Sequence, residues 1–236
     1  MTAIKDSVVL VTGGSRGIGK ALVEELYARG AGKVYATARD PRSVTHPDAV
    51  ALALEVTNPD SVAAVAEQAQ DVTVLINNAG AATRSRFLTS SLDDIRRVFE
   101  INFYGPLLLT RAFAPVIERN GGGHILNVLS VHSWFARAEG GAYSASKSAF
   151  WSQTNSLRQA LQPQGIGVTG LHMGLVDTDM TAHVDALKIS PRDVAVAALD
   201  GVESDAFEVL TDDLTRWVKD ALSGDPVAMY ERLAAR

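Results

Sequence analysis

Short apolar runs alternate with longer segments of helical period along nearly the whole chain, and this alternation constrains the fold more than any other feature of the sequence. It is typical of βαβ units, in which successive strands lie parallel in one sheet. Some runs, such as VVLV at residues 8–11, are continuously apolar, which is typical of strands that helices cover on both faces. The expected strands are residues 8–11, 34–37, 50–54, 72–76, 124–129, 167–171 and 207–210. The expected helices are residues 18–28, 60–69, 92–118, 143–161, 192–202 and 212–222.

The seven expected strands predict one wide sheet. No linker-like, repeated or low-complexity stretch divides the 236 residues, and a hydrophobic fraction of 47% is sufficient for a sizeable core. We therefore predict a single α/β domain over residues 1–236, of the doubly wound Rossmann type. Its sheet is expected to be mainly parallel and seven-stranded, with helices on both faces.

Composition argues against several function classes. The formal net charge is −5 and there is no basic run, so neither nucleic acid nor an anionic membrane is an expected partner. The absence of cysteine excludes disulfides and thiol chemistry, and the five histidines lack the spacing of a zinc-binding helix, so no metal site is expected. The chain does not start with a charged segment followed by an apolar core, which predicts a soluble cytoplasmic protein.

A glycine-rich segment, VTGGSRGIG at residues 11–19, joins the first expected strand to the first expected helix. Gly13 permits a tight turn, Gly17 permits close approach of a pyrophosphate, and Gly19 permits close packing of the helix on the strand. The spacing is G-x-x-x-G-x-G rather than the commoner G-x-G-x-x-G, and such a turn alone is also compatible with a plain strand-to-helix corner. The predicted dinucleotide-binding residues of this segment are Gly13, Ser15, Arg16, Gly17, Ile18 and Gly19.

The same letters also match the G-x-S-x-G elbow of serine hydrolases, with Ser15 as the nucleophile. Asp177 and His183 follow in the order that such hydrolases use. However, an elbow after the first strand leaves no earlier strands to supply oxyanion donors, and the six-residue separation of Asp177 and His183 leaves little room. A serine hydrolase is therefore a remote alternative.

The residue that follows the second expected strand indicates which dinucleotide is bound. Arg39 stands where an acidic side chain would bind a ribose diol, so its guanidinium can pair with a 2′-phosphate instead. Arg16 in the glycine turn can reach the same phosphate. Asp40 tempers this argument, because a small shift of the strand end would bring a carboxylate into the pocket. We predict that NADP(H) is favoured over NAD(H).

Tyr143 and Lys147 begin an expected helix four residues apart, so the phenol and the ammonium lie on one face. A neighbouring cation favours the phenolate, which lowers the tyrosine pKa from ~10 and makes the group a usable proton donor and acceptor near neutral pH. The glycine turn, NNAG at residues 77–80, Ser130 and YSASK at residues 143–147 follow in order. This set resembles the short-chain dehydrogenase/reductase family in its shorter, single-domain, NADP-dependent form, over about residues 7–178.

The resemblance implies an enzyme of the carbonyl reductase type, which transfers a hydride between NADP(H) and a ketone, an aldehyde or a secondary alcohol. It implies that Tyr143 exchanges the proton, Ser130 holds the substrate oxygen and Lys147 binds the nicotinamide ribose. It also implies that Asn102 anchors a water between Lys147 and solvent. Further cofactor contacts are implied at Glu55, Val56, Asn78, Ala79, Gly80, Gly174, Val176 and Thr178.

The chain departs from the family pattern at Met173, which stands at the place of the usual proline after the sixth expected strand. A flexible thioether in place of a rigid backbone position predicts a looser or reshaped substrate wall. The segment that covers the substrate, residues 179–190, is short, which predicts a small lid and an open pocket. The expected substrate contacts are Ser130, His132, Trp134, Phe135, Tyr143 and Met173. The aromatic residues after Ser130 are equally compatible with local loop packing.

A protein that binds NADP(H) as a sensor or scaffold, without turnover, is the main alternative, because a fold alone does not establish activity. The complete catalytic set argues against it, since a binding protein has no need for Ser130. The resemblance also implies a homodimer or homotetramer that pairs through two long helices, around residues 103–118 and 144–161.

Overall fold

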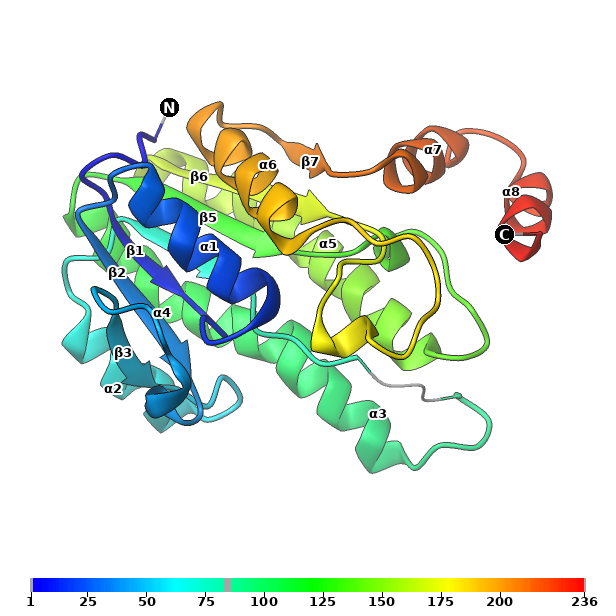
Figure 1. The fold of residues 1–236 in the computed structure, drawn as a ribbon, viewed down its shortest axis with the longest axis horizontal. Helices are drawn as coiled ribbons and strands as arrows, with labels where there is room; N and C mark the ends of the chain where they lie inside the picture. The colour runs from blue at the N-terminus through cyan, green and yellow to red at the C-terminus, as the bar shows by residue number, and fades with distance from the viewer. Residues whose placement is uncertain (1, 83–85, 236) are drawn as a thin grey trace.

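Seven parallel strands form one sheet in the order β3-β2-β1-β4-β5-β6-β7 (Figure 1). The computed structural model describes residues 2–82 and 86–235. The strands are β1 (Val8–Val11), β2 (Lys33–Ala38), β3 (Val50–Ala53), β4 (Val74–Asn77), β5 (Gly123–Val128), β6 (Ile166–His172) and β7 (Glu208–Leu210). Every strand pair is parallel, so the expected sheet is confirmed.

Helices cover both faces of this sheet, which confirms the doubly wound α/β fold (Figure 1). The α-helices that the structure describes are α1 (Gly17–Ala28), α2 (Pro59–Gln68), α3 (Leu92–Phe99), α4 (Gly105–Arg119), α5 (Gly141–Leu161), α6 (Pro191–Glu203), α7 (Asp213–Ala221) and α8 (Pro226–Ala234), of which α7 and α8 lie beyond the end of the sheet. No helix within the described ranges has both the length and the apolar composition needed to cross a membrane.

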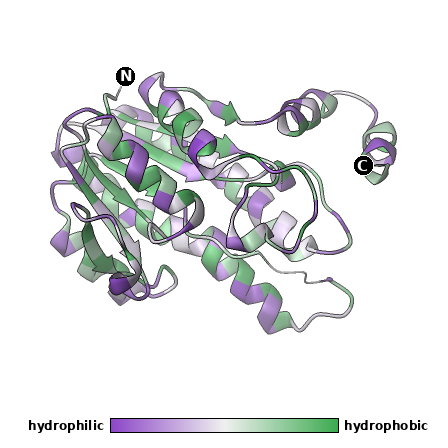
Figure 2. Cartoon of the chain, in the orientation of Figure 1, coloured by the Kyte–Doolittle hydropathy of each residue, from purple (hydrophilic) through white to green (hydrophobic). Residues whose placement is uncertain are grey.

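The sheet separates two hydrophobic clusters, which explains why its strands lack polar alternation. Along β1, Val9 and Val11 belong to the cluster that includes residues of α1 and α6, and Leu10 belongs to the cluster that includes residues of α2 and α4. All three side chains are fully buried, and each stabilises the fold by about 1.5–3 kcal/mol. In Figure 2 the strands are mostly green, whereas the helices also carry purple, hydrophilic residues.

Two features differ from the expected elements. The expected helix at residues 92–118 is interrupted by a π-helical turn, Glu100–Tyr104, between α3 and α4, which a regular helical period does not reveal. Helix α8 lies beyond the last expected element. Its start signals are present in the sequence, since Asp225 accepts a hydrogen bond from the Val227 N–H at 2.9 Å and proline occupies the first turn.

The strand order reverses between β1 and β4, so a crevice opens where their carboxyl ends meet, as in other doubly wound sheets. Helices α7 and α8 extend beyond this end of the sheet (Figure 1). They pack against the segment that follows β5, because Val131 and Phe135 share a third cluster with Val218, Met229 and Leu233. The C-terminal helices therefore support the loop that carries Ser130.

Candidate active site

The glycine turn between β1 and α1 has a backbone shape that side chains would prevent. Gly13 and Gly17 have φ values of +65° and +53°, in the left-handed region that favours glycine. A Cβ on Gly19 would lie only 2.0 Å from the carbonyl oxygen of Gly13. The three positions are therefore restricted to glycine by conformation or by space.

The N-terminus of α1 fits an anionic ligand. Arg16 precedes the helix without a capping hydrogen bond from its side chain, and the first turn contains no acidic residue. No capping side chain thus competes for the first N–H groups, and the helix dipole favours a negative charge at this end. Ser15 in the turn and Ile18 in α1 are partly buried here. The turn therefore fits the pyrophosphate of a dinucleotide.

Asn78 and Thr12 fix the glycine turn to the end of β4. The Asn78 side-chain amide donates to the carbonyl oxygens of Thr12 and Gly13, at 2.8 and 3.2 Å. The Thr12 hydroxyl accepts hydrogen bonds from the backbone N–H groups of Asn78 and Ala79, both at 2.9 Å. Sequence reasoning missed Thr12, although it directly precedes Gly13, because its partner Asn78 lies 66 positions away.

The two arginines predicted to choose the cofactor have exposed side chains. Arg16 Nη1 lies 3.6 Å from Asp179 Oδ2, in an exposed ion pair that contributes little energy. Asp40, the residue after Arg39, accepts hydrogen bonds from the backbone N–H, Nε and Nη2 of Arg42, at 3.0, 2.9 and 2.9 Å. These bonds lower the pKa of Asp40. The carboxylate that would compete with Arg39 is therefore engaged in its own ion pair.

Glu55 and Val56 lie just beyond β3, where the resemblance implies contacts to the adenine. The Glu55 carboxylate accepts a hydrogen bond from the Thr57 hydroxyl at 3.1 Å. Val56 is buried and packs closely on Gly105, since a Cβ added to Gly105 would lie 3.1 Å from Val56 Cγ2. Their contacts to a cofactor stay a prediction.

Lys147 lies deep beside Tyr143 on α5. Its Nζ donates to the carbonyl oxygen of Val128 at 2.8 Å and lies 5.9 Å from the centre of the Tyr143 ring. Burial lowers the pKa of Lys147 to about 8. The ammonium therefore titrates just above neutral pH, in a place where it faces the phenol.

Tyr143 differs from the expectation that a neighbouring cation lowers its pKa. Burial raises the pKa of Tyr143, and a hydrogen bond with Ser130 lowers it only in part. The physical reason is desolvation, because Lys147 is buried and Tyr143 is partly buried, which disfavours the charged form of each. In this structure Tyr143 is a neutral phenol that can donate a proton.

Asn102 is buried in the π-helical turn and connects two parts of the site. Its Oδ1 accepts from the Ala81 N–H at 2.9 Å, and its Nδ2 donates to Ala81 O at 2.8 Å and to Ser146 Oγ at 3.0 Å. The Ser146 hydroxyl in turn donates to Tyr143 O at 2.7 Å. A Cβ on Gly80 would lie 3.3 Å from Asn102 Oδ1. Asn102 therefore ties the loop after β4 to the first turns of α5.

His132 is the predicted substrate contact that lies beside Tyr143. The two rings meet edge-on with their centres 6.0 Å apart, and His132 Nδ1 lies 3.4 Å from Ser144 Oγ. Burial lowers the pKa of His132, so its imidazole is neutral near pH 7. It can therefore offer a hydrogen bond or ring contact beside the phenol, but not a charge.

The other predicted substrate contacts are mostly buried. Trp134 stacks on His172, with ring centres 4.0 Å apart. Phe135 is 5% exposed and belongs to the third cluster, and Met173 is 5% exposed and belongs to the cluster with residues of α1 and α6. The thioether thus packs in the core, and contacts of these three residues with a substrate stay predictions.

The loop after β6 approaches the glycine turn. The Gly174 N–H donates to Asp212 Oδ2 at 2.7 Å, and Val176 is buried. Thr178 Cγ2 lies 3.1 Å from where a Cβ on Gly17 would be. Sequence reasoning missed Asp212, which follows β7 and holds this loop through the Gly174 N–H. The available signal was its position as the N-cap of α7. The expected lid, residues 179–190, contains one 3-10 turn and is mostly exposed.

The structure does not assemble the serine hydrolase alternative. Asp177 and His183 are exposed, and in the part of the chain that the structure describes no hydrogen bond or ion pair joins Ser15, Asp177 and His183 to one another. Among the described residues there is also no group of three or more His, Cys, Asp or Glu that could hold a metal ion.

Comparisons with known proteins point to one family. Residues 7–188 match the family described as short chain dehydrogenase. An oxidoreductase of Staphylococcus aureus strain USA300, described as uncharacterized, is 30% identical over 213 residues, which cover 84% of this chain and 92% of that protein.

Solved structures agree with this match. A short chain dehydrogenase from Burkholderia cenocepacia J2315, crystallised in complex with NADP, is 36% identical with a TM-score of 0.93, and 99% of each chain is covered. A short chain dehydrogenase/reductase from Burkholderia phymatum in complex with NAD has a TM-score of 0.85 at 23% identity, covering 96% of this chain and 99% of that chain. The second likeness extends to the fold alone.

Proposed function

Because this chain belongs to the short-chain dehydrogenase/reductase family, we propose that it is an NADP(H)-dependent carbonyl reductase, which also oxidises secondary alcohols in the reverse direction. The observation that carries this proposal is the convergence of Ser130, Tyr143 and Lys147 at the carboxyl end of β5. This is the edge of the sheet that also carries the glycine turn (Figure 1).

The chain's own residues perform the acid-base part of the reaction. The nicotinamide, when bound, supplies or accepts the hydride. As negative charge develops on the carbonyl oxygen, the hydroxyls of Ser130 and Tyr143 donate hydrogen bonds to it, and these bonds are strongest in the transition state. Tyr143, which its raised pKa keeps protonated, gives its proton to that oxygen. The Lys147 ammonium then stabilises the phenolate that remains.

NADP(H) is the cofactor that the charges favour. Arg39 and Arg16 bring two exposed guanidinium groups to the end of the site where a 2′-phosphate would lie, and Asp40 is neutralised by Arg42. The crystal structure of the similar Burkholderia cenocepacia protein contains NADP. Cofactor contacts of Glu55, Val56, Gly80, Gly174, Val176 and Thr178 belong to the same proposal.

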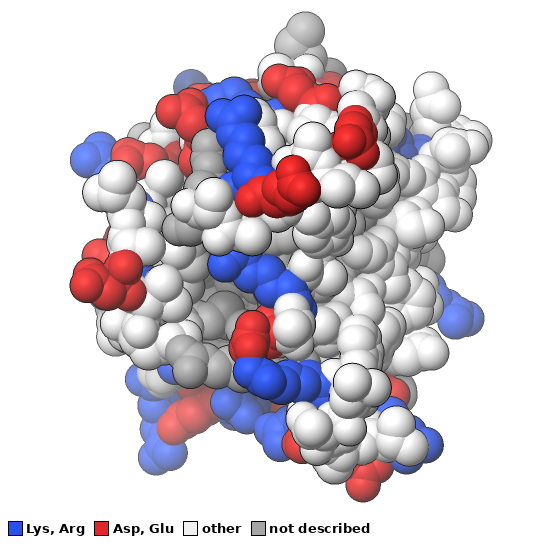
Figure 3. Space-filling model, turned by 90° about the vertical axis from the view of Figure 1, so that its right-hand side faces the viewer, with Lys and Arg blue, Asp and Glu red and all other residues white. Residues whose placement is uncertain are grey.

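The substrate that the surroundings favour is a hydrophobic carbonyl compound. The exposed large hydrophobic residues of the segment after β4 and of residues 179–190 are Phe87, Leu88, Met180 and Leu187. The Phe87 ring packs on the start of α5, since a Cβ on Gly141 would lie 2.8 Å from it, two residues before Tyr143. Uncharged side chains cover a broad part of the face at this end of the molecule (Figure 3). An apolar substrate would bury surface here that is otherwise exposed to water.

We also propose that the protein is a homodimer or homotetramer that pairs through α4 and α5. The adjoining helical surface carries exposed apolar side chains, with Leu92 66% and Tyr104 46% exposed. Size-exclusion chromatography with light scattering tests this: a monomeric mass at micromolar concentration contradicts it.

A turnover assay tests the proposed function. NADPH and NADH are each incubated with a panel of aromatic and aliphatic ketones and aldehydes, and loss of nicotinamide absorbance is followed for the wild type and for Tyr143→Phe. We expect turnover with NADPH that Tyr143→Phe abolishes. Tight NADPH binding without turnover of any carbonyl would favour the sensor or scaffold instead, and equal turnover by both proteins would contradict the mechanism.

A further inference from the structure

His172, the last residue of β6, reaches the backbone of Ser130. It is fully buried, and its Nδ1 lies 3.1 Å from the Ser130 carbonyl oxygen. Because a carbonyl oxygen only accepts, Nδ1 carries the hydrogen of this bond. The same oxygen also accepts from the Ser133 N–H at 3.0 Å, and the Ser130 hydroxyl accepts from the His132 N–H at 3.1 Å. The backbone and the hydroxyl of Ser130 are thus fixed together.

Glu208 of β7 lies on the other side of the imidazole. Its Oε1 is 3.6 Å from His172 Nε2 and accepts a hydrogen bond from Trp151 Nε1 at 2.7 Å, while its Oε2 accepts from Lys219 Nζ. Burial disfavours the carboxylate, but the polar groups around it, His172, Lys219 and Trp151, outweigh this effect and lower the pKa of Glu208 to about 2. A fixed negative charge therefore lies beside the ring, where Nε2 has no hydrogen-bond partner.

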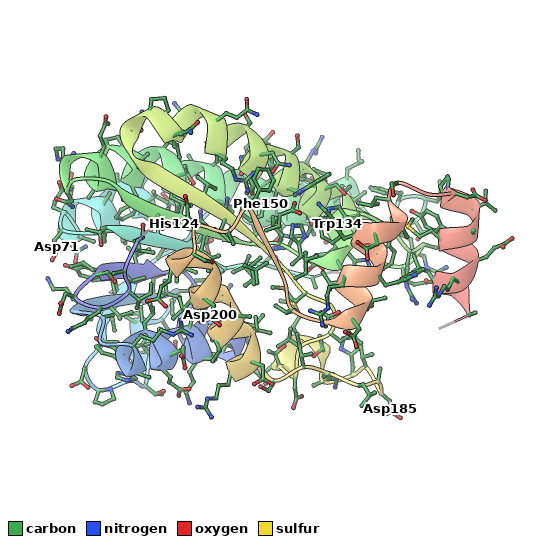
Figure 4. The ribbon with its side chains drawn as sticks, turned by 90° about the horizontal axis from the view of Figure 1, so that it is seen from above. Asp71, His124, Trp134, Phe150, Asp185 and Asp200 are labelled. Carbon is green, nitrogen blue, oxygen red and sulfur yellow. The ribbon has the colours of Figure 1, made fainter. Side chains whose placement is uncertain are left out.

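Trp134 holds the plane of the imidazole. Its ring stacks on that of His172 with an interplanar angle of 17° and meets Trp151 edge-on at 6.2 Å. Lys219 Nζ lies 4.7 Å from the centre of the Trp134 ring. In Figure 4, Trp134 is seen near α7, whereas His124 lies towards the opposite end of the sheet. The cluster thus joins β6, β7, α5 and α7 around one histidine.

We propose that His172, whose ring plane is held by Trp134, is a positioning residue that directs the Ser130 hydroxyl towards Tyr143 and the substrate oxygen. This inference rests on the proposed function, because it assigns His172 a role in a reaction that Ser130 serves. It also gives Trp134 and Lys219 a role behind the site, where they act through His172 rather than on the substrate.

Three variants separate positioning from packing. His172→Phe keeps a ring to stack on Trp134 but removes the donor, whereas His172→Asn keeps a donor near the place of Nδ1. Glu208→Gln leaves both rings in place and removes the fixed charge. His124→Phe is the matched control, because it also replaces a fully buried histidine of the sheet, at the end remote from the site.

The decisive measurement is a double-mutant cycle with Ser130→Ala, in which the single-turnover rate is measured at saturating NADPH. We expect His172→Phe to lower the rate about 10- to 100-fold in the wild-type background, and to change it by less than about twofold once Ser130 is alanine. His172→Asn should restore most of the rate, and the NADPH Kd should stay within about twofold for all variants. Glu208→Gln, which keeps the Nδ1 donor and both rings, should change the rate by less than about twofold.

The same experiment overturns the inference if His172→Phe lowers the rate by an equal factor in both backgrounds, since the effect would then not pass through Ser130. The inference is also overturned if His124→Phe lowers the rate as much as His172→Phe, because the loss would then follow from replacing any buried histidine. If His172→Phe does not fold, Trp134→Leu, which removes the ring stacked on His172, takes its place in the cycle. If the proposed function is wrong, the outcome is different, because Ser130→Ala and Tyr143→Phe then turn over substrate as fast as the wild type.

Discussion

The side-chain amide of Asn102 exchanges a pair of hydrogen bonds with the backbone of Ala81, at 2.9 and 2.8 Å, in the manner of two paired strands. The π-helical turn brings Asn102 to this position, because one wider turn displaces its side chain from the regular helical path. The loop after β4 is thereby attached to the π-helical turn and, through Ser146, to α5, which carries Tyr143 and Lys147.

Replacing Asn102 should therefore lower both the free energy of unfolding and the catalytic rate. Asn102→Ala leaves the backbone groups of Ala81 and the Ser146 hydroxyl without their partner in a buried region, so we expect a loss of about 2–4 kcal/mol in the free energy of unfolding. Denaturant unfolding followed by circular dichroism measures it. Asn102→Asp cannot donate and buries a carboxylate against the Ala81 carbonyl oxygen, so it should lose at least as much as Asn102→Ala. A loss below 0.5 kcal/mol for both, within the usual range of surface substitutions (roughly ±0.5 kcal/mol), would contradict the role of this pair.

The cofactor preference should depend on the two exposed arginines. Arg39→Ala removes a charged donor from the 2′-phosphate, so we expect the NADPH Kd to rise about 10- to 100-fold while the NADH Kd changes little. Arg16→Ala should have a smaller effect in the same direction. Fluorescence titration with both nucleotides measures this, and Arg119→Ala, at the end of α4, is the exposed control. Equal weakening for NADPH and NADH would contradict phosphate recognition by Arg39.

Met173 should act on stability before it acts on selectivity. Its side chain is 5% exposed in the core, so we expect Met173→Ala to destabilise the protein by about 2–5 kcal/mol. Met180→Ala, in the lid with a 48% exposed side chain, should cost less than about 0.5 kcal/mol. Thermal and denaturant unfolding compare the two. A changed substrate range with unchanged stability in Met173→Ala would instead support the substrate wall expected from the sequence.

His124 should make the protein sensitive to acid. It is buried at the amino end of β5 with Nε2 2.8 Å from Thr169 Oγ1, and burial lowers its pKa to about 4 from 6.5. Because the folded value is the lower one, the unfolded chain binds more protons as the pH falls from 6.5 towards 4, and stability is lost in that window. Between pH 7 and pH 4, we expect the free energy of unfolding of the wild type to fall by about 3 kcal/mol more than that of His124→Gln. Parallel pH profiles for the two proteins would show that His124 does not titrate in this way.

The sequence was sufficient for the features whose cause is local. Apolar runs predicted the strands, and the four-residue spacing of Tyr143 and Lys147 predicted that they share a face of α5, because both patterns depend on periods of a few residues. The contacts of Thr12 with Asn78 and of His172 with Ser130 were not predictable, since they join segments 66 and 42 positions apart. The sign of the Tyr143 pKa shift was also wrong, because spacing says nothing about how deeply a pair is buried.

In the proposed reaction, hydride passes directly between the nicotinamide and a carbonyl carbon while Tyr143 supplies the proton. Incubating the ketone that the panel identifies with NADPH deuterated at the transferring C4 position follows both transfers at once. We expect an alcohol product with one deuterium on its carbinol carbon for the wild type and no alcohol for Tyr143→Phe. Alcohol without deuterium, or the same deuterated alcohol from Tyr143→Phe at the wild-type rate, would contradict it.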